Sequence, residues 1–365
     1  MAKIDIIVPV YKTEKFLKQC LESIINQTFE DIKIICVNDG SPDKSLKILE
    51  EYAQKDCRIK VITQKNLGLS GARNTGIENS NSDFIMFVDS DDYIDNTMCE
   101  KMYNAAQKAD IAVCGVQEFE SKKRFLKPKN SYFELNFDGQ NDIFDYIVEK
   151  TNVVACNKIF RRTVLNEYNI RFPQGLHFED NPFFFSFMSI ARSVFFLNEK
   201  LYFYRKHSQT ITAQKNDGHK FDYIYGAKHY YDFLVQHNKY EEKKKLFWFY
   251  WLKVFELCKK QLNENDCRTL YDICAGFLNW FDTDELKEFL SEADYQLICN
   301  ILDRKYFIKK EYALNYFGLQ LFRYKKMKHK TEIFVLGLPG YKNRNAVNYK
   351  EIKLFNKVIK SSKFL

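Results

Sequence analysis

The order of apolar segments in the first hundred residues constrains the fold more than any other feature. Four short runs rich in β-branched residues are the predicted strands: 4–8, 32–37, 59–62 and 84–88. Between them, apolar residues recur at the three- and four-residue spacing of amphipathic helices. These helices are predicted over residues 16–25, 46–52 and 70–79. Strands that are apolar on both faces and alternate with helices predict an α/β fold, a mostly parallel sheet flanked by helices.

The pattern changes twice further along the chain. Residues 101–215 mix helical and strand-like segments, whereas the pattern beyond residue 216 is mainly helical, as in 220–236. We therefore expect a first domain at 1–215, with halves at 1–100 and 101–215. A mainly helical C-terminal region at 216–365 should follow it.

The strongest chemical signal is the acidic segment after the fourth strand. Ligands of such sheets bind at the carboxyl ends of the strands. There the chain reads Asp89-Ser90-Asp91-Asp92, and three neighbouring carboxylates repel one another unless a cation offsets their charge. A calcium-binding EF-hand loop is excluded, because Tyr93 and Ile94 stand where it needs an oxygen ligand and a glycine. Mg²⁺ or Mn²⁺ shared with phosphate oxygens fits the segment, and so does a solvated turn that caps a helix.

Two further segments carry residues able to bind a ligand. NLGLSGARNTGI includes Gly68 and Arg73, and its glycines allow close backbone approach while the arginine can pair with a phosphate or a carboxylate. Glycines of this kind also serve helix entry alone. Asp39, after the second strand, can accept hydrogen bonds from a nucleobase or form an Asp-Gly turn. The first turn, VPVYKTE, is neither a P-loop nor a dinucleotide-binding glycine loop.

An acidic pair precedes an aromatic helix in GLHFEDNPFFFSF. Pro182 suits the first helical position, so Glu179 and Asp180 lie at the helix start. A carboxylate beside apolar surface can be tuned to act as a general base. Acidic residues near a helix start are also favoured by the helix dipole alone. His207 is a lone histidine in a polar, basic stretch.

Taken together, these segments resemble the family 2 glycosyltransferases of the GT-A fold. The matching stretches, in order, are IDIIVPVYKTEKFLKQCLESIINQT, IICVNDGSPD, NLGLSGARNTGI and FIMFVDSDDYID, and weaker matches recur at CNKIFRR and FED. The resemblance implies that the expected sheet is the Rossmann-like sheet of a GT-A catalytic domain. The half at 1–100 would bind the nucleotide sugar and the half at 101–215 the acceptor.

The resemblance assigns nucleotide contacts to the first strand end, at Pro9, Val10 and Tyr11, and places Gly68 and Arg73 in the same binding region. It gives Asp39 the nucleobase, which is usually uracil. The Asp-x-Asp motif of the family falls on Asp89 and Asp91: Asp89 would face the ribose, and Asp91 would bind the Mn²⁺ or Mg²⁺ that bridges the diphosphate. His207 would complete the metal shell, as a histidine does in some members.

For catalysis, the resemblance places the acidic pair at Glu179-Asp180 and the base at Asp180. The implied reaction is one inverting displacement, in which a hexosyltransferase-type enzyme moves a sugar from a nucleotide donor, with UDP expected, to an acceptor hydroxyl. The QxxRW element of processive synthases has no counterpart, which favours addition of one or a few sugars. The implied acceptor is a glycan or lipid-linked precursor of lipopolysaccharide, lipooligosaccharide or capsule.

Three other interpretations compete with this one. A nucleotidyltransferase acting on sugar phosphates would share the sheet and the acidic site, but it needs a glycine- and Arg/Lys-bearing loop where this chain has VPVYKTE. A non-catalytic scaffold would not need Asp39, Asp89, Asp91 and Asp180 together. Nucleic acid is not an expected partner, because no RNA- or DNA-binding motif is present.

The charge of the chain is unevenly distributed. The net charge is +8, yet residues 304–365 hold 16 Lys and Arg against 3 acids, so residues 1–303 are net acidic. The basic tail at 304–365 mixes Tyr, Phe and Leu with Lys at partly helical spacing, which fits an interfacial helix on an anionic membrane or a solvated basic face. No spanning segment or cleavable signal is evident, so we expect a cytoplasmic protein that can lie peripherally on the membrane. The oligomeric state is left open.

Overall fold

The computed structural model describes residues 2–120, 139–143, 148, 151–207, 219–303, 308–316, 319–327 and 331–335. The chain forms two compact units, residues 1–260 and residues 261–365. The first unit therefore extends well beyond the boundary expected at residue 215. It includes two long helices that the sequence assigned to the C-terminal region.

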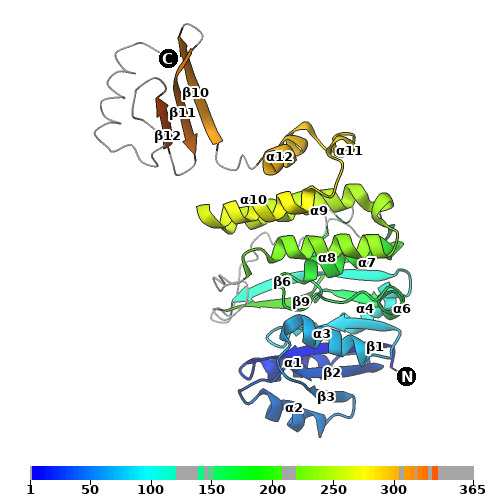
Figure 1. The fold of residues 1–365 in the computed structure, drawn as a ribbon. Helices are drawn as coiled ribbons and strands as arrows, with labels where there is room; N and C mark the ends of the chain where they lie inside the picture. Colours follow the sequence, from blue (N-terminus) through cyan, green and yellow to red (C-terminus); the bar gives the residue numbers. More distant parts are fainter. Residues whose placement is uncertain are drawn as a thin grey trace. The chain divides into compact units, whose positions relative to one another are not determined.

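The first half of the main sheet is parallel, as predicted. Its strands are β1 (Ile4–Val10), β2 (Ile32–Asn38), β3 (Ile59–Thr63) and β4 (Phe84–Phe87). They lie in the order β3-β2-β1-β4, and each neighbouring pair is parallel (Figure 1). All seven residues of β1 are buried, because helices cover both faces of the sheet.

The second half of the sheet is mixed. It contains β5 (Tyr93–Ile94), β6 (Ile111–Glu120), β7 (Gly139–Asp142), β8 (Lys158–Arg161) and β9 (Ser193–Lys206). β8 lies between β4 and β6 and is antiparallel to both, whereas β6 and β9 are parallel. A single nine-stranded sheet thus joins the two predicted halves of the first domain.

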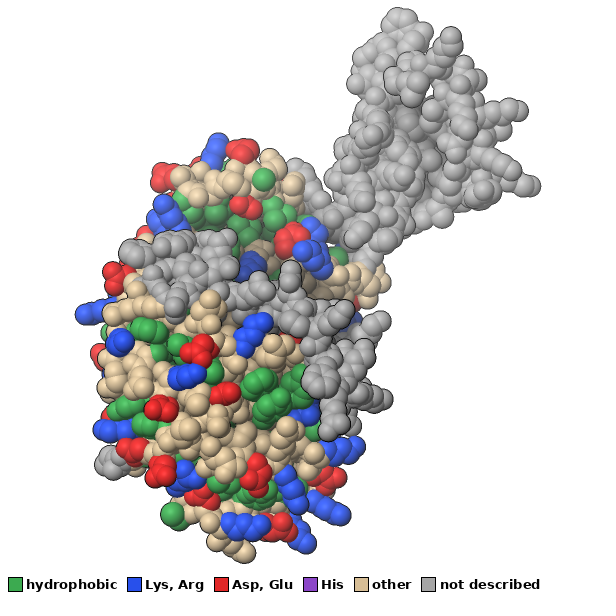
Figure 2. All heavy atoms as spheres, turned by 180° about the vertical axis from the view of Figure 1, so that it is seen from behind, with side chains coloured by type: hydrophobic (Ala, Val, Ile, Leu, Met, Phe, Trp, Pro, Cys, Tyr) green, Lys and Arg blue, Asp and Glu red, His purple; other side chains and the backbone are tan. Residues whose placement is uncertain are grey.

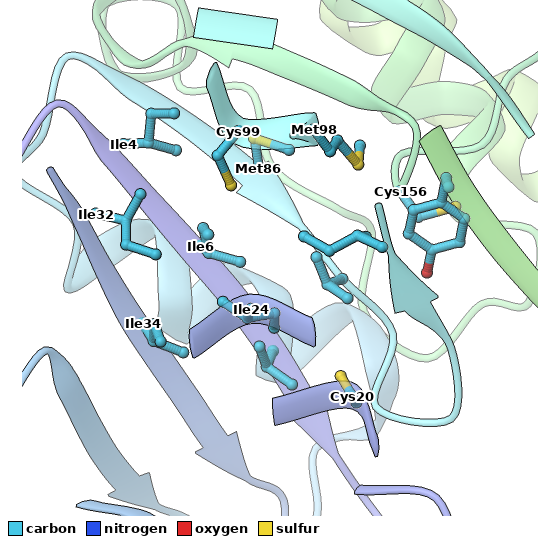
Figure 3. Packing of buried hydrophobic residues seen from close by; sticks show 14 of the residues in the cluster. Ile4, Ile6, Cys20, Ile24, Ile32, Ile34, Met86, Met98, Cys99 and Cys156 are labelled. Atoms are coloured by element: carbon cyan, nitrogen blue, oxygen red, sulfur yellow. The ribbon is translucent and has the colours of Figure 1, made fainter. Parts of the chain in front are cut away.

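One face of this sheet carries three helices: α1 (Leu17–Ile25), α2 (Ser45–Ala53) and α4 (Met98–Ala106). Figure 3 shows how side chains of α1 and α4 pack on the sheet, with Ile24 of α1 near Ile6 of β1 and Met98 of α4 near Met86 of β4. Alternate residues of each strand point to this face, because successive side chains of a strand face opposite sides. These residues form one continuous apolar cluster.

The other face is covered by α3 (Gly68–Glu78) and α7 (Asp180–Ile190), with the short α6 (Arg162–Glu167) beside α7. Gly76 of α3 lies so close to β1 that an added Cβ would come within 2.3 Å of Ile7. On α7, Phe183 meets Phe87 of β4 edge to face, with ring centroids 6.0 Å apart. These two helices bring Arg73 and the acidic pair to the same face of the sheet.

The helices α8 (Asp222–Gln236) and α9 (Tyr240–Gln261) pack behind α7 (Figure 1). Ser189 of α7 and Tyr230 of α8 share a hydrogen bond of 2.7 Å between hydroxyl oxygens. Phe185 lies against Tyr250 of α9, with ring centroids 4.3 Å apart. Trp248 and Trp251 are also buried. Aromatic packing of this kind makes α8 and α9 part of the first unit.

The second unit begins with α10 (Glu264–Leu278), α11 (Thr283–Lys287) and α12 (Glu292–Leu302), each capped by the side chain before it. Three antiparallel strands follow: β10 (Ile308–Tyr316), β11 (Leu319–Met327) and β12 (Thr331–Val335). The prediction of a helix within the basic tail is therefore wrong for the residues that form β10, β11 and β12. Their Tyr, Phe, Ile and Val residues favour strands, and this outweighs the partly helical spacing.

No helix among the described residues is long and apolar enough to cross a membrane.

Candidate functional site

The ends of the first two strands lie side by side at the carboxyl edge of the sheet. β1 and β2 pair in register, with Val10 beside Asn38. The backbone N–H of Asp39 then donates to the carbonyl oxygen of Val10 at 2.9 Å. Pro9 and Val10 are buried within β1, whereas Tyr11 is 42% exposed just beyond it. The structure thus brings Asp39 together with the strand end predicted to contact a nucleotide.

Asp39 is buried, and its carboxylate is held in a fixed orientation. Its Oδ1 accepts hydrogen bonds from Nε2 of Gln64 at 2.7 Å and from the backbone N–H of Leu67 at 2.8 Å. Gly68 follows with φ +75°, in the left-handed region that favours glycine. Gly68 therefore shapes the turn that brings Leu67 to Asp39 at the start of α3.

Arg73 lies at the centre of the acidic residues. It is only 2% exposed. Its Nη1 donates to Glu179 Oε1 and to Asp180 Oδ1, both at 2.7 Å, and its Nη2 donates to Asp89 Oδ1 at 2.9 Å. Of the two partners expected from the sequence, phosphate or carboxylate, the structure shows carboxylates. One guanidinium thus joins the end of β4, the start of α7 and α3.

Burial and mutual repulsion raise the pKa values of Glu179 and Asp180. Burial, with a further contribution from the Asp180 charge, raises the pKa of Glu179 to about 7, although the Arg73 cation opposes this. Burial also raises the pKa of Asp180, while Arg73 lowers it and the Asp89 charge adds to the rise. Three carboxylates around one guanidinium carry a net negative charge, so a proton or a cationic group is favoured here.

Asp91 faces His207, as the predicted metal shell requires. Asp91 Oδ2 lies 2.9 Å from His207 Nε2, and the imidazole ring lies on Phe16 with centroids 4.8 Å apart. Burial raises the pKa of the Asp91 carboxyl, and the Asp89 charge adds to this, whereas the bond to His207 lowers it. The structure brings together these two residues, which lie more than a hundred positions apart in sequence.

The pair fits a divalent ion that is shared with a substrate. Within the part of the chain that the structure describes, no three His, Cys, Asp or Glu side chains are arranged to hold a metal. Mg²⁺ and Mn²⁺ at phosphate-transfer sites, however, are commonly held by one or two protein groups plus phosphate oxygens. The Asp91 oxygen and the His207 nitrogen supply such a partial set.

The third acid of the segment, Asp92, has a structural role that the sequence pattern does not distinguish from the roles of Asp89 and Asp91. It is 1% exposed and accepts hydrogen bonds from the Tyr202 hydroxyl and from the backbone N–H of Arg205, both at 2.7 Å. The Arg205 side chain donates to the backbone oxygen of Asp91 at 2.6 Å. Asp92 and Arg205 therefore hold the acidic segment against β9, and no local feature of the sequence predicts this.

The turn before α7 has an unusual backbone. Phe178 has φ +60°, a conformation that non-glycine residues rarely adopt. Its ring stacks on Tyr223 of α8, with centroids 4.0 Å apart and planes 10° apart. The backbone N–H of His177 donates to Asp222 Oδ2 at 2.7 Å. The start of α8 thus fixes the turn that directs Glu179 and Asp180 toward Arg73, and no local sequence pattern predicts this support.

Comparison with known proteins gives the family of the chain. Residues 5–168 match the model of glycosyl transferase family 2. EpsH of Bacillus subtilis (strain 168), named as a glycosyltransferase, is 37% identical over 262 residues, which cover 66% of this chain and 72% of that protein. The poly(ribitol-phosphate) beta-glucosyltransferase of Bacillus spizizenii is 37% identical over 177 residues, which cover 47% of this chain and 27% of that protein.

Solved structures support the fold. Residues 1–349 of S. aureus TarS, crystallised with UDP, align with a TM-score of 0.67 at 16% identity, covering 91% of this chain and 98% of that one. This likeness confirms the predicted GT-A type of sheet. The length and identity of the match to EpsH, together with the family model, confirm the predicted enzyme class over a nucleotidyltransferase or a scaffold. The chain belongs to glycosyltransferase family 2.

Proposed function

We propose that this glycosyltransferase moves a sugar from a UDP-linked donor to a hydroxyl of a bacterial surface glycan or its lipid-linked precursor, with inversion at the anomeric carbon. The observation that carries the proposal is the convergence of Asp89, Glu179 and Asp180 on Arg73 at the carboxyl edge of the sheet. The UDP complex of the similar TarS structure supports the nucleotide. The poly(ribitol-phosphate) acceptor named for one relative supports the acceptor class.

The donor would lie across the ends of β1, β2 and β4. Asp39, with Oδ1 already bonded to Gln64 and Leu67, would accept from the nucleobase through its other oxygen. The exposed ring of Tyr11 would stack on the base. Asp89 would accept from the ribose. Pro9 and Val10 would form the floor beneath the nucleotide, and Gly68 would keep the entrance to α3 open.

Asp91 and His207 would hold Mn²⁺ or Mg²⁺ together with the diphosphate. When bound, such an ion neutralises negative charge that develops on the departing nucleoside diphosphate. The closeness of the two side chains, 2.9 Å, supports their joint assignment.

The acceptor hydroxyl would attack the anomeric carbon while Asp180 removes its proton. The new bond joins the acceptor oxygen to the sugar. The bond from the sugar to the diphosphate breaks, and the electron pair leaves with the nucleoside diphosphate. Asp180 is the better candidate base, because its side chain is 20% exposed and that of Glu179 is 10% exposed.

A substitution at Asp180 tests the role of the base. In Asp180→Asn, the amide keeps the shape of the side chain but cannot take a proton, so we expect kcat to fall by about 10²- to 10⁴-fold. UDP affinity, measured by calorimetry, should change little. Glu179→Gln is the matched comparison and should retain more activity. Turnover at the wild-type rate in Asp180→Asn would show that the base is elsewhere, and release of pyrophosphate instead of UDP would contradict glycosyl transfer itself.

We further propose that the basic segment 304–365 brings the enzyme to an anionic membrane surface that carries a lipid-linked acceptor. Its 16 basic residues against 3 acids support this. By contrast, Figure 2 shows Lys and Arg interspersed with Asp and Glu over the described part of one face of the molecule.

A further inference from the structure

Lys158 of β8 is a fully buried lysine whose charge the proposed mechanism does not yet use. Its Nζ donates hydrogen bonds to three oxygens: Asn152 Oδ1 at 2.7 Å, the Val154 carbonyl at 2.6 Å and Asn157 Oδ1 at 2.8 Å. A neutral amine has only two protons to donate, and an ammonium has three. The three acceptors therefore match the charged form of Lys158.

This ammonium organises the segment that reaches the proposed base. Its three acceptors lie on both sides of Ala155, whose backbone N–H lies close enough to the Asp180 carboxyl to lower the pKa of that group. The segment is also tied to β6, because Asn157 Nδ2 donates to the Cys114 carbonyl at 2.5 Å. Lys158 thus fixes the backbone on either side of the amide that contacts Asp180.

Lys158 also faces α7 directly. Its Nζ lies 5.0 Å from the ring centroid of Phe184, four positions after Asp180 on the same helix. Titratable and charged groups act on Asp180 from α3, from β8 and from the segments after β4, before β8 and before α7. These groups are Arg73, Lys158, Asp89, Cys156 and Glu179. The positive charges of Arg73 and Lys158 lower the pKa of Asp180, whereas burial and the Asp89 charge raise it. Burial in turn lowers the pKa of Lys158 to about 7.

We propose that Lys158 is a positioning residue for the base: it holds the backbone around Ala155 beside the Asp180 carboxylate, and its charge keeps that carboxylate ionised. The inference rests on the assignment of Asp180 as base in the proposed function. Burying an ammonium costs free energy, and an apolar side chain would fill the same space without that cost. The need to keep Asp180 ionised explains why a charged lysine, and not an apolar residue, is buried at position 158.

The acid limb of the pH profile of kcat/KM tests the inference, because it reports the pKa of the base in the free enzyme. Removing a nearby positive charge destabilises the carboxylate form, so the limb moves to higher pH. In Lys158→Met, which keeps the length of the side chain, we expect a move of about one pH unit. Below the limb, kcat/KM would fall about tenfold. Lys60→Met is the control, since Lys60 also bonds an asparagine, Asn79, but is exposed.

A second variant separates charge from shape. Asn152→Asp keeps the oxygen that accepts from Lys158 but adds a negative charge beside the ammonium. If Lys158 acts through its charge, the acid limb again moves to higher pH, although the hydrogen bond is preserved. This variant also decides the question if Lys158→Met does not fold. UDP affinity near the wild-type value verifies an intact nucleotide site in each variant.

The outcomes distinguish this inference from the proposed function. If Asp180→Asn turns over normally, the assigned base is wrong, whatever Lys158 does. If Asp180→Asn is inactive and both Lys158→Met and Asn152→Asp keep the wild-type acid limb, only the role of Lys158 is overturned. Movement of the limb in both variants, with none in Lys60→Met, supports it.

Discussion

At the scale of single residues, Arg73 matters most for the integrity of the site. Its guanidinium contacts three carboxylates while being almost completely buried. A lysine could not reproduce these contacts, because it presents one point charge instead of a planar fork. Breaking a buried charge network by removing one partner typically costs about 3–5 kcal/mol of stability, since the remaining charges are left uncompensated.

Arg73→Met should therefore destabilise the fold in a pH-dependent manner. Without the guanidinium, the pKa values of Glu179 and Asp180 in the folded state rise further above their unfolded values. The folded state then binds more protons than the unfolded state, so stability is lost as pH rises through the folded pKa values. We expect a loss of about 3 kcal/mol at pH 8 and a smaller one at pH 5. Urea denaturation at both pH values measures this, and an equal loss at both would contradict the account.

At the scale of elements, α8 supports the site without contributing a predicted site residue. The strained backbone of Phe178 persists because its ring stacks on Tyr223 and the neighbouring amide bonds Asp222. His177 adds to this contact, since its ring stacks on that of His219 with centroids 3.6 Å apart. Loss of the support would let the start of α7, with its acidic pair, shift from its position.

Tyr223→Ala should lower catalysis more than binding. A displacement of about 1 Å at the reacting groups can lower the rate by roughly 100-fold. We therefore expect kcat to fall by about 10- to 100-fold. UDP affinity should remain close to wild type, because Asp39 and Tyr11 belong to other elements. Tyr225→Ala is the matched control on the same helix, as this tyrosine is 44% exposed. Steady-state kinetics compares the two, and equal effects would remove the proposed support.

At the scale of the whole molecule, the two parts of the chain differ in net charge: residues 1–303 are net acidic and residues 304–365 are strongly basic. Each Lys or Arg near an anionic membrane contributes about 1 kcal/mol of attraction. Replacing four lysines of the basic segment by Gln should weaken binding to phosphatidylserine vesicles by about 100-fold or more, and so should raised salt. The four positions are Lys309, Lys310, Lys325 and Lys326.

The control replaces four exposed lysines of the first unit in the same way. These are Lys15, Lys18, Lys47 and Lys55. Co-sedimentation with vesicles measures both variants. If the two sets weaken binding equally, the attraction belongs to the whole chain, and if neither does, the membrane proposal fails.

The sequence was most informative where signals are local. The alternation of buried strands and amphipathic helices predicted β1 to β4 and their parallel pairing, and the polar residues at the strand ends led to the choice of Asp39, Asp89 and Asp91 as candidate site residues. The role of Lys158 could not be predicted, because lysine is normally solvated and its three acceptors are recognisable only in the folded chain. Likewise, nothing local distinguishes Asp92, which bonds the distant Tyr202, from the acids beside it.

The same long-range character applies to the tail and to the later helices. Strand formation at β10 to β12 contradicts the helical spacing noted there, because aromatic and β-branched residues suit either structure until pairing partners are known. The first unit extends to residue 260 because α8 packs on α7 and Tyr250 of α9 packs on Phe185 of α7, contacts that no change in composition marks.

The contact between Arg73 and Asp180 has a consequence for how the enzyme is made. The two residues are 107 positions apart, and contacts of such high sequence separation form late, after costly loop closure. On the ribosome, Arg73 and Asp89 emerge well before the acidic pair does. Until those residues emerge, Asp89 is the one carboxylate of the three that is available to Arg73, and the proposed catalytic centre cannot yet be assembled. If Asp180 is the base, as proposed, chains that have not reached this stage of folding would not transfer sugar.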